Sequence, residues 1–283
     1  MRRLSTLLII SAISVASYAQ NSTEVVAARH PAYKYINGSY DGGYDANGMR
    51  TGFGSANVEG SGTYKGNWAN NLRSGYGQAV FANGDKYTGD WKDDQRQGKG
   101  VYYFINGDIY TGEFVNDIMN GQGVYRYANG DQYTGTVQNG QLTGHGSCLY
   151  ANGERYEGDF LNGKKNGEGK YYYRDGKIYE GTFVAEVKMG SGIMYFTNGD
   201  KYVGQFTNNK RAGFGTFYYA NGDVYEGEFA NGLMDGKGKF HWADGDTFVG
   251  TWKANKRQGE GKLIPKEGEA ITKIYSMGVE VAR

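Results

Sequence analysis

The chain has 283 residues, among them 48 Gly, 2 Pro, 26 Tyr, 13 Phe and 4 Trp. Glycine is thus more than twice as frequent as its usual ~7%, which excludes an ordinary helical domain because glycine weakens helix interiors. The many aromatic residues exclude a disordered chain. The near balance of 31 basic and 30 acidic residues leaves no overall charge that would attract nucleic acid. With one cysteine and three histidines, we expect no disulfide, metal or cofactor.

Residues 1–19 have the features of a secretory signal peptide. Arg2 and Arg3 precede an apolar run over residues 4–16, and Ala19 ends a Ser-Tyr-Ala triplet typical of a cleavage site. The alternative is a membrane anchor, although the run is shorter than the ~20 residues that span a bilayer. We expect cleavage after Ala19 and a soluble exported protein, periplasmic or secreted, whose association with the cell surface stays open.

The rest of the chain repeats with a period of 23 residues. Four glycine columns are filled in every copy, for instance by Gly66, Gly75, Gly77 and Gly84. Two further aromatic columns, which begin at Trp68 and Phe81, are each interrupted once. The leading aromatic column, which opens each copy, consists of Tyr64, Tyr87, Tyr110, Tyr133, Tyr156, Tyr179, Tyr202, Tyr225 and Phe248.

Tyr-x-Gly-x-(Trp/Phe), then Gly-x-Gly, then Asn-Gly-Asp at this spacing resembles the MORN repeat, over residues 64–270, with a degenerate copy from Tyr40. The resemblance implies an all-β fold, an elongated single-layer antiparallel β-meander built from repeated hairpins, in a family used mostly as scaffolds and attachment modules. The expected organisation is a signal peptide (1–19), an N-terminal leader (20–39), the repeat array (40–270) and a C-terminal cap (271–283).

Each copy contains two runs of strand-forming residues, joined on one side by Asn-Gly-Asp and on the other by an expected eight-residue loop. If residues 129–131 form a three-residue loop, Tyr127 lies opposite Tyr133, which is the register we prefer. A two-residue turn would instead place Arg126 opposite Tyr133. The preferred register gathers the aromatic rings on one face, because a slip of one residue would send the side chains of one strand to the opposite face. To cover that face, the loops must fold over it, the sheet must curl into a trough, or a partner must bind.

Three patterns suggest chemistry that we explain otherwise. Cys148 near His145 could form a thiol dyad, but Cys148 occupies a core column and is expected to be a buried filler. The Gly-x-Gly pairs lack the further glycine and the helix of a phosphate loop. One carboxylate per copy is few for calcium, and Asp stabilises tight turns. The acidic column consists of Asp85, Asp108, Asp131, Glu154, Asp200, Asp223 and Asp246. We predict no enzymatic activity.

The expected eight-residue loops carry a basic column that would line one edge of the sheet. Such an edge could bind anionic lipid head groups, or it could be an ordinary solvated edge. The candidate residues are Arg73, Arg96, Lys164, Lys165, Lys188, Lys210, Arg211, Lys256 and Arg257.

The aromatic columns form a second candidate surface. One part is the leading column from Tyr87 to Tyr225, namely Tyr87, Tyr110, Tyr133, Tyr156, Tyr179, Tyr202 and Tyr225. The other is the Tyr103 column, on the face opposite the glycines, which contains Tyr103, Tyr172, Tyr195, Tyr218 and His241. These rings could stack on sugars or dock a protein, or they could pack as ordinary strand residues.

We therefore predict a non-enzymatic exported repeat scaffold that mediates protein–protein attachment or self-association, with the aromatic groove as the favoured surface. One alternative is attachment to anionic phospholipid through the basic edge. Another is binding of carbohydrate or cell wall through the aromatic rows.

Overall fold

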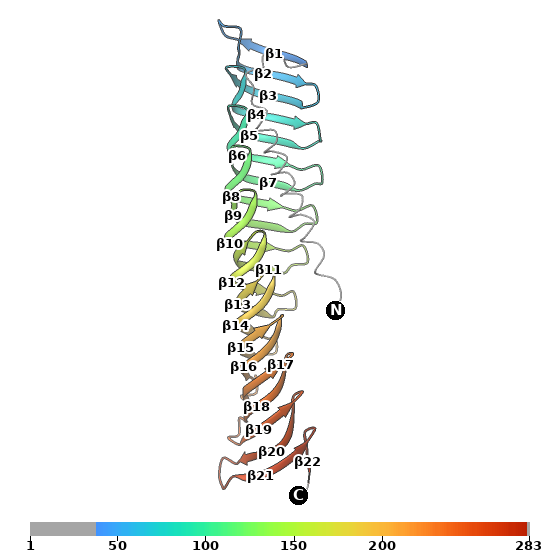
Figure 1. The fold of residues 1–283 in the computed structure, drawn as a ribbon, viewed down its shortest axis with the longest axis vertical. Coiled ribbons are helices and arrows are strands. Elements are labelled where there is room, and N and C mark those ends of the chain that lie inside the picture. Colours follow the sequence, from blue (N-terminus) through green and yellow to red (C-terminus); the bar gives the residue numbers. More distant parts are fainter. Residues whose placement is uncertain (1–37, 282–283) are drawn as a thin grey trace. The chain divides into compact units, whose positions relative to one another are not determined.

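The computed structural model describes residues 38–281, and every regular element in this range is a β-strand (Figure 1). The predicted signal peptide and most of the predicted leader lie outside the described residues. The described residues divide into two compact units, those up to residue 151 with 160–163, and residues 152–159 with those from 164 on.

In the first unit, each strand from β1 to β10 is antiparallel to the next. The strands are β1 (Gly38–Tyr44), β2 (Arg50–Val58), β3 (Gly62–Ala69), β4 (Leu72–Phe81), β5 (Lys86–Lys92), β6 (Gln95–Tyr103), β7 (Ile109–Val115), β8 (Ile118–Arg126), β9 (Gln132–Gln138) and β10 (Gln141–Leu149). Strand β11 (Arg155–Leu161) is divided between the two units.

The second unit continues the same pattern, with antiparallel pairing from β12 to β22. Its strands are β12 (Lys164–Tyr172), β13 (Ile178–Val184), β14 (Val187–Tyr195), β15 (Lys201–Thr207), β16 (Lys210–Tyr218), β17 (Val224–Ala230), β18 (Leu233–His241), β19 (Thr247–Lys253), β20 (Lys256–Ile264), β21 (Ile271–Ser276) and β22 (Val279–Val281). The predicted all-β antiparallel meander of hairpins is confirmed.

The predicted eight-residue loop is wrong. A two-residue turn replaces it, for example Asp93-Asp94 between β5 and β6, and both turn residues have positive φ (51° and 66°). Positive φ at both central positions defines the type I′ turn, whose twist suits a β-hairpin. The following strand therefore begins at Gln95, and residues expected in a loop belong to the sheet.

Both predicted registers across the Asn-Gly-Asp connection are also wrong. Tyr133 pairs with Tyr125, not with Tyr127 or Arg126, and Gly135 pairs with Gly123. The loop lies one residue earlier than expected, at residues 128–130, because the amide of Tyr127 donates a backbone hydrogen bond of 2.9 Å to the carbonyl oxygen of Asp131 and so closes it. Each tyrosine of the leading column consequently lies beside a directly paired set of two glycines.

The strands bend, which encloses the aromatic face. Arg96 and Tyr102 are six residues apart in β6, about 20 Å along an extended strand, yet the Arg96 guanidinium lies 4.9 Å from the centre of the Tyr102 ring. The bend coincides with Gly98, whose φ of +66° favours glycine. Figure 1 shows curved strands in both units. Of the three ways to cover the aromatic face, the structure adopts the trough.

Candidate interaction surface

The inside of the trough is filled by the leading aromatic column. Tyr87 is fully buried, and its hydroxyl donates a hydrogen bond to the carbonyl oxygen of Asp90 at 3.0 Å. Its ring lies over the glycine pair Gly89 and Gly100, where a Cβ atom at either position would come within 2.5 Å of it. The other tyrosines from Tyr110 to Tyr225 are equally buried, so a ligand cannot reach this half of the predicted aromatic surface.

The aromatic column that begins at Trp68 packs against the leading column and holds its rings in place. Tyr87 meets Trp91 of its own strand edge to face, with ring centres 5.2 Å apart, and meets Phe114 of the next copy at 5.1 Å in the same way. Edge-to-face pairs at such distances add about 0.5–1.5 kcal/mol each beyond burial. The row of alternating rings forms the core of each unit, and in the first unit the buried Val137 takes the place of one ring.

The basic column lies in strands and not in loops, which corrects the predicted edge. Arg73, Arg96, Lys165, Lys188, Arg211 and Arg257 each occupy the second position of a strand, and each places its cation over aromatic rings at 4.1–5.3 Å. Cations attract the negative faces of aromatic rings, and a planar guanidinium stacks on them well. These side chains therefore help to close the trough: Arg96 and Lys165 are buried, and the other four are half-buried.

Arg96 shows the arrangement most completely. It is 7% exposed, and its guanidinium contacts four rings, those of Phe81, Tyr87, Tyr102 and Phe114. Its Nε atom pairs with Asp117 Oδ1 at 3.1 Å, and the same carboxylate accepts the Arg96 backbone N–H at 2.8 Å. This side chain thus links two successive copies.

Lys188 occupies the same column with a different partner. Its Nζ donates to the Tyr173 hydroxyl at 2.8 Å, and the turn residue that accepts its backbone N–H is the neutral Asn209. Burial, with a smaller contribution from the charge of Lys177, lowers the pKa of Lys188 to about 8. Its counterpart Lys165 instead has an acidic partner, with 2.5 Å between Lys165 Nζ and Glu186 Oε2.

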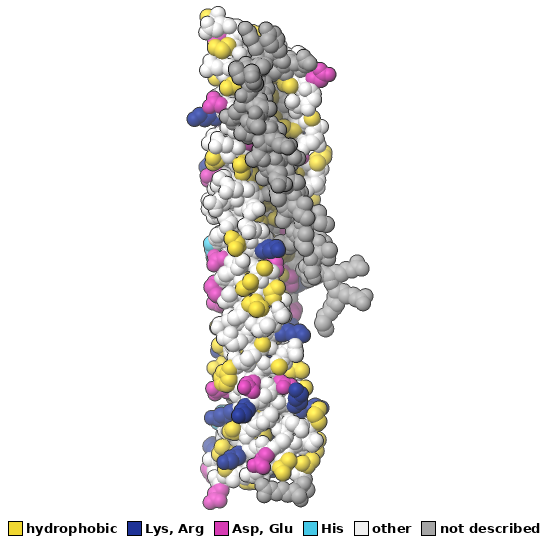
Figure 2. Space-filling model, viewed as in Figure 1, with side chains coloured by type: hydrophobic (Ala, Val, Ile, Leu, Met, Phe, Trp, Pro, Cys, Tyr) yellow, Lys and Arg dark blue, Asp and Glu magenta, His cyan; other side chains and the backbone are white. Residues whose placement is uncertain are grey.

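Only Lys164, Lys210 and Lys256 of the predicted basic edge are exposed, each at the first position of a strand. On the face drawn in Figure 2, basic and acidic side chains are interspersed. Mixed charges produce a weaker attraction to an anionic membrane than a uniform basic edge would. Within residues 38–281 there is also no helix long and apolar enough to cross a bilayer.

The acidic column stabilises the connections between strands. Asp108 accepts the hydroxyl of Tyr125 at 2.9 Å and the backbone N–H of Ala128 at 2.8 Å. Its own backbone N–H donates to Asn106 Oδ1 at 3.0 Å. The side chain thus joins one connection to the next, and this contact with the following backbone N–H recurs at Asp131, Asp200, Asp223 and Asp246. Turn chemistry, as predicted, accounts for the column.

Cys148 and His145 lie on opposite sides of the sheet. Cys148 is buried and pairs with Tyr133 in the register, whereas His145 is exposed. A side chain on each face of one strand cannot form a nucleophile and base pair. No group of three His, Cys, Asp or Glu residues suited to a metal occurs within residues 38–281.

The outer face of the sheet presents the accessible rings. Of the Tyr103 column, Tyr103, Tyr195 and Tyr218 are exposed and Tyr172 is half-buried. In the second unit, Lys201 lies between Tyr195 and Tyr218 in the register and places its amine 4.5 Å from the Tyr218 ring. This half of the predicted aromatic surface is therefore open to a partner.

A second set of exposed rings was not predicted. Phe53, Tyr76 and Phe214 each stand between the two glycines of a Gly-x-Gly pair, and Phe214 is 58% exposed. The sequence shows an aromatic residue between two glycines at each of these positions, but its exposure follows from the bend of the strand, which leaves a ring on the outer side without a neighbour that could bury it. Phe214 and Tyr218 lie on the same face of β16, four residues apart.

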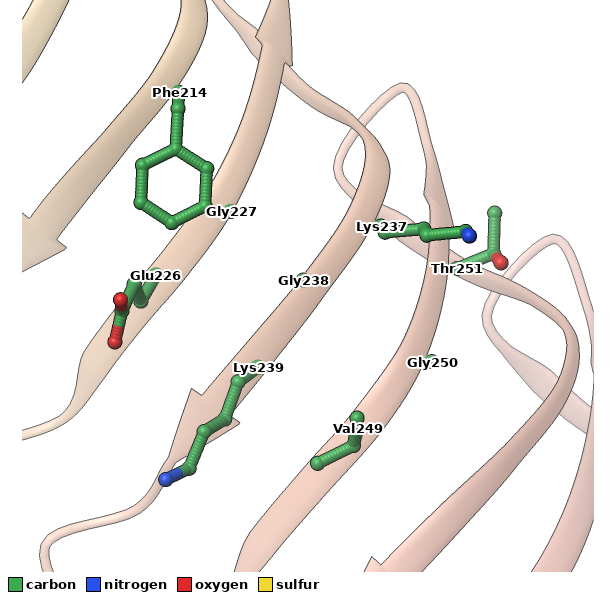
Figure 3. Close-up of a pocket in the computed structure, with 9 residues that line it drawn as sticks. All are labelled: Phe214, Glu226, Gly227, Lys237, Gly238, Lys239, Val249, Gly250 and Thr251. Carbon is green, nitrogen blue, oxygen red and sulfur yellow. The ribbon is translucent and has the colours of Figure 1, made fainter.

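A hollow of about 440 Å³ adjoins Phe214 (Figure 3). Its floor is the backbone of three paired glycines, Gly227, Gly238 and Gly250. The side chains around it are Phe214, Glu226, Lys237, Lys239, Val249 and Thr251. We define the outer patch as Tyr195, Phe214 and Tyr218 together with this hollow. It combines exposed rings, an apolar wall and charges of both signs.

Comparison with known families bears on the same residues. A family model described as MORN repeat matches nine consecutive segments, residues 64–86, 87–109, 110–132, 133–155, 156–178, 179–201, 202–224, 225–247 and 248–264. Each segment starts at a residue of the leading aromatic column. No curated protein matches the sequence.

Solved structures show weaker similarities. The TCP10 domain of Danio rerio CPAP, in complex with a peptide of Danio rerio STIL, is 14% identical, with 87% of this chain and 100% of that chain covered and a TM-score of 0.42. The SAS-4 (dCPAP) TCP domain of Drosophila melanogaster, in complex with a proline-rich motif of Ana2 (dSTIL), is 19% identical, with 54% and 83% covered and a TM-score of 0.37. At these TM-scores the similarities identify neither the fold nor the function of the chain.

Proposed function

Since this chain belongs to the MORN repeat family, we propose that it is a non-enzymatic exported scaffold that binds another protein, or a second copy of itself, through the outer patch. The observation that carries the proposal is the contrast between the two faces of the sheet. The inner rings are closed off, with Tyr87 at 0% exposure, whereas Tyr195 and Tyr218 are 37% and 40% exposed on the outer face.

The outer patch has the composition of a protein-binding surface. Aromatic side chains offer a large contact area and dominate binding energy at protein interfaces. Phe214 stands beside a hollow that could receive an apolar side chain, and Lys237, Lys239 and Glu226 surround that hollow with charge. An apolar centre with a polar rim is the usual anatomy of such interfaces.

Two other classes of partner, anionic phospholipid and carbohydrate, are supported by fewer residues of the structure. Attachment to anionic phospholipid would depend on the exposed lysines Lys164, Lys210 and Lys256, because the other cations of the basic column cover aromatic rings. Binding of carbohydrate would use the rings of Tyr195 and Tyr218, which can stack on sugars as well as on protein. Both are alternatives for the same experiment.

The test compares two variants of the exported chain as bait against the native cell envelope. Phe214→Ala/Tyr218→Ala removes the outer rings, and Lys164→Glu/Lys210→Glu/Lys256→Glu reverses the exposed basic residues. We expect the ring variant to lose capture of a protein partner by at least about tenfold, because central aromatic residues contribute 2 kcal/mol or more. The lysine variant should retain it.

Parallel assays with anionic liposomes and with envelope glycans distinguish the alternatives. Liposome binding that the lysine variant abolishes and the ring variant retains would favour the membrane. Glycan binding that depends on the rings, without capture of a protein, would favour carbohydrate. Circular dichroism of each variant establishes that the sheet remains folded.

A further inference from the structure

The residue ten positions after the leading aromatic residue of a copy can hold the next two-residue turn along the chain. Gln97 Oε1 accepts the backbone N–H of Asn116 at 2.9 Å. Gln258 Oε1 accepts that of Met277 at the same distance. Both donors are the first residue of their turn, with φ of 49°. We call the positions of Gln97 and Gln258 the turn-holding column.

Met189 occupies the turn-holding column with a thioether in place of the carboxamide. It lies in β14, which pairs with β15 (Figure 1). Its Sδ atom is 3.3 Å from the backbone nitrogen of Asn208, the first residue of the turn that follows β15, where φ is 50°. A thioether sulfur is a weak acceptor, so this N–H has a weaker partner than the N–H of Asn116 has in Gln97.

One oxygen atom added to the sulfur of Met189 would reproduce the glutamine arrangement. In methionine sulfoxide the oxygen follows the same sequence of bonds from Cα as in glutamine, since Sδ takes the place of Cδ. Gln97 and Gln258 show that an oxygen at this point of the side chain reaches the N–H of a first turn residue. The methionine side chain is flexible enough to bring its oxygen there.

The burial of the methionines distinguishes Met189 from those of the core. Met189 is half-buried, whereas Met194 and Met234 are each 9% exposed. Met194 pairs with Tyr179 and Tyr202 in the register, so a sulfoxide there would place a polar oxygen among aromatic rings, which is costly without a donor. Oxidation is favoured at accessible sulfur atoms, and Met189 can react while the core stays closed.

We propose that Met189 is a site of reversible oxidation by hydrogen peroxide, at which the sulfoxide oxygen accepts the N–H of Asn208 and holds the turn more firmly. A lone pair of the sulfur attacks one peroxide oxygen, and the S–O bond forms as the O–O bond breaks. The hydroxide that leaves takes the proton of the transferred oxygen and becomes water. The sulfur is thereby oxidised and the peroxide reduced. Methionine sulfoxide reductases reverse the step.

Amide exchange at Asn208, measured by NMR on the purified chain, tests the proposal. Met189→Gln supplies the oxygen permanently, and the matched control Met189→Leu removes the acceptor at nearly constant volume. Wild type and control are both treated with peroxide, at a dose at which mass spectrometry of peptides finds Met194 and Met234 intact. We expect exchange at Asn208 about fivefold slower in the oxidised wild type and in Met189→Gln than in Met189→Leu, as a hydrogen bond of ordinary net strength would give.

Oxidised and reduced Met189→Leu should exchange alike at Asn208, although the exposed Met277 reacts in both chains. The proposal is overturned if Met189 stays reduced until the core methionines react, or if its oxidation leaves exchange at Asn208 unchanged or faster. An equal change in the peroxide-treated control would also overturn it, as would exchange in Met189→Gln as fast as in Met189→Leu. The amide of Asn116 is the reference for intact turns, because its acceptor Gln97 does not react with peroxide.

Discussion

The ring of Tyr87 lies against Gly100 of the neighbouring strand, in the space that a side chain at position 100 would occupy. A Cβ atom on Gly100 would come within 2.5 Å of Tyr87 Cζ. This relationship recurs in the other copies and explains why two of the four glycine columns exist. They accommodate a ring, whereas Gly98 and the turn glycines permit a positive φ.

The first prediction concerns that contact. Gly100→Ala should lower the free energy of unfolding by about 3 kcal/mol, the upper part of the range for overpacking a core. The matched control is Gly163→Ala, where the added Cβ meets nothing within 4 Å but φ is +74°; backbone strain there should cost about 1 kcal/mol. Urea unfolding measures both. Equal losses in the two variants would contradict the packing explanation.

The second prediction concerns Arg96. Arg96→Ala should cost about 3 kcal/mol, because it removes the cation from four rings and leaves Asp117 without its ion-pair partner. Lys256→Ala, at an exposed position of the second unit, should change stability by less than about 0.5 kcal/mol. A small effect at Arg96 would show that the basic column does not close the trough.

The third prediction concerns pH. Burial lowers the pKa of Lys188 to about 8 from its ordinary 10.5, so between these values the unfolded chain holds a proton that the folded chain has lost. Stability should therefore rise with pH in this window, by at most about 3 kcal/mol. Lys188→Met should abolish the rise when unfolding free energies are compared at pH 7 and 9.5.

Two observations separate this effect from other titrations. Lys165→Met should destabilise the protein at pH 7, since Glu186 then loses its partner. Above pH 10 the wild-type chain and Lys188→Met should both lose stability. Burial raises the pKa of Tyr64, Tyr133 and Tyr202 to about 12 in the folded chain, so the phenols of the unfolded chain ionise first. A rise that persists in Lys188→Met would refute the assignment to Lys188.

The fourth prediction concerns the connections between strands. Asp108→Ala should cost about 2–3 kcal/mol, since the buried Tyr125 hydroxyl and the Ala128 N–H both lose their acceptor. Asp131→Ala removes the corresponding bond to Ala151 at a more exposed position and should cost less. Thermal unfolding of the two variants provides the comparison, and a larger loss at Asp131 would contradict it.

The period, the strand content and the gathering of rings on one face could be predicted from sequence, because glycine and aromatic columns recur without insertion and side chains alternate along a strand. The type I′ turn could also have been predicted from the sequence. Asp93-Asp94 carries no strong signal, but Asn139-Gly140, Asn162-Gly163 and Asn231-Gly232 occupy the same columns, and Asn-Gly is the usual sequence for that turn. The register was missed because it depends on the residue at which the loop begins, and the backbone hydrogen bond between Tyr127 and Asp131 places the loop one residue earlier than expected.

The burial of the basic column was decided by tertiary structure alone. Nothing in the spacing of Arg96 and Tyr102 within one strand indicates that their side chains meet, since an extended strand would hold them about 20 Å apart. The bend at Gly98 brings them together, and it turns a row of cations from a predicted solvent-facing edge into part of the core. Which rings remain open on the outer face follows from the same bend, because rings on its inner side are enclosed and rings on its outer side lose the neighbours that could cover them.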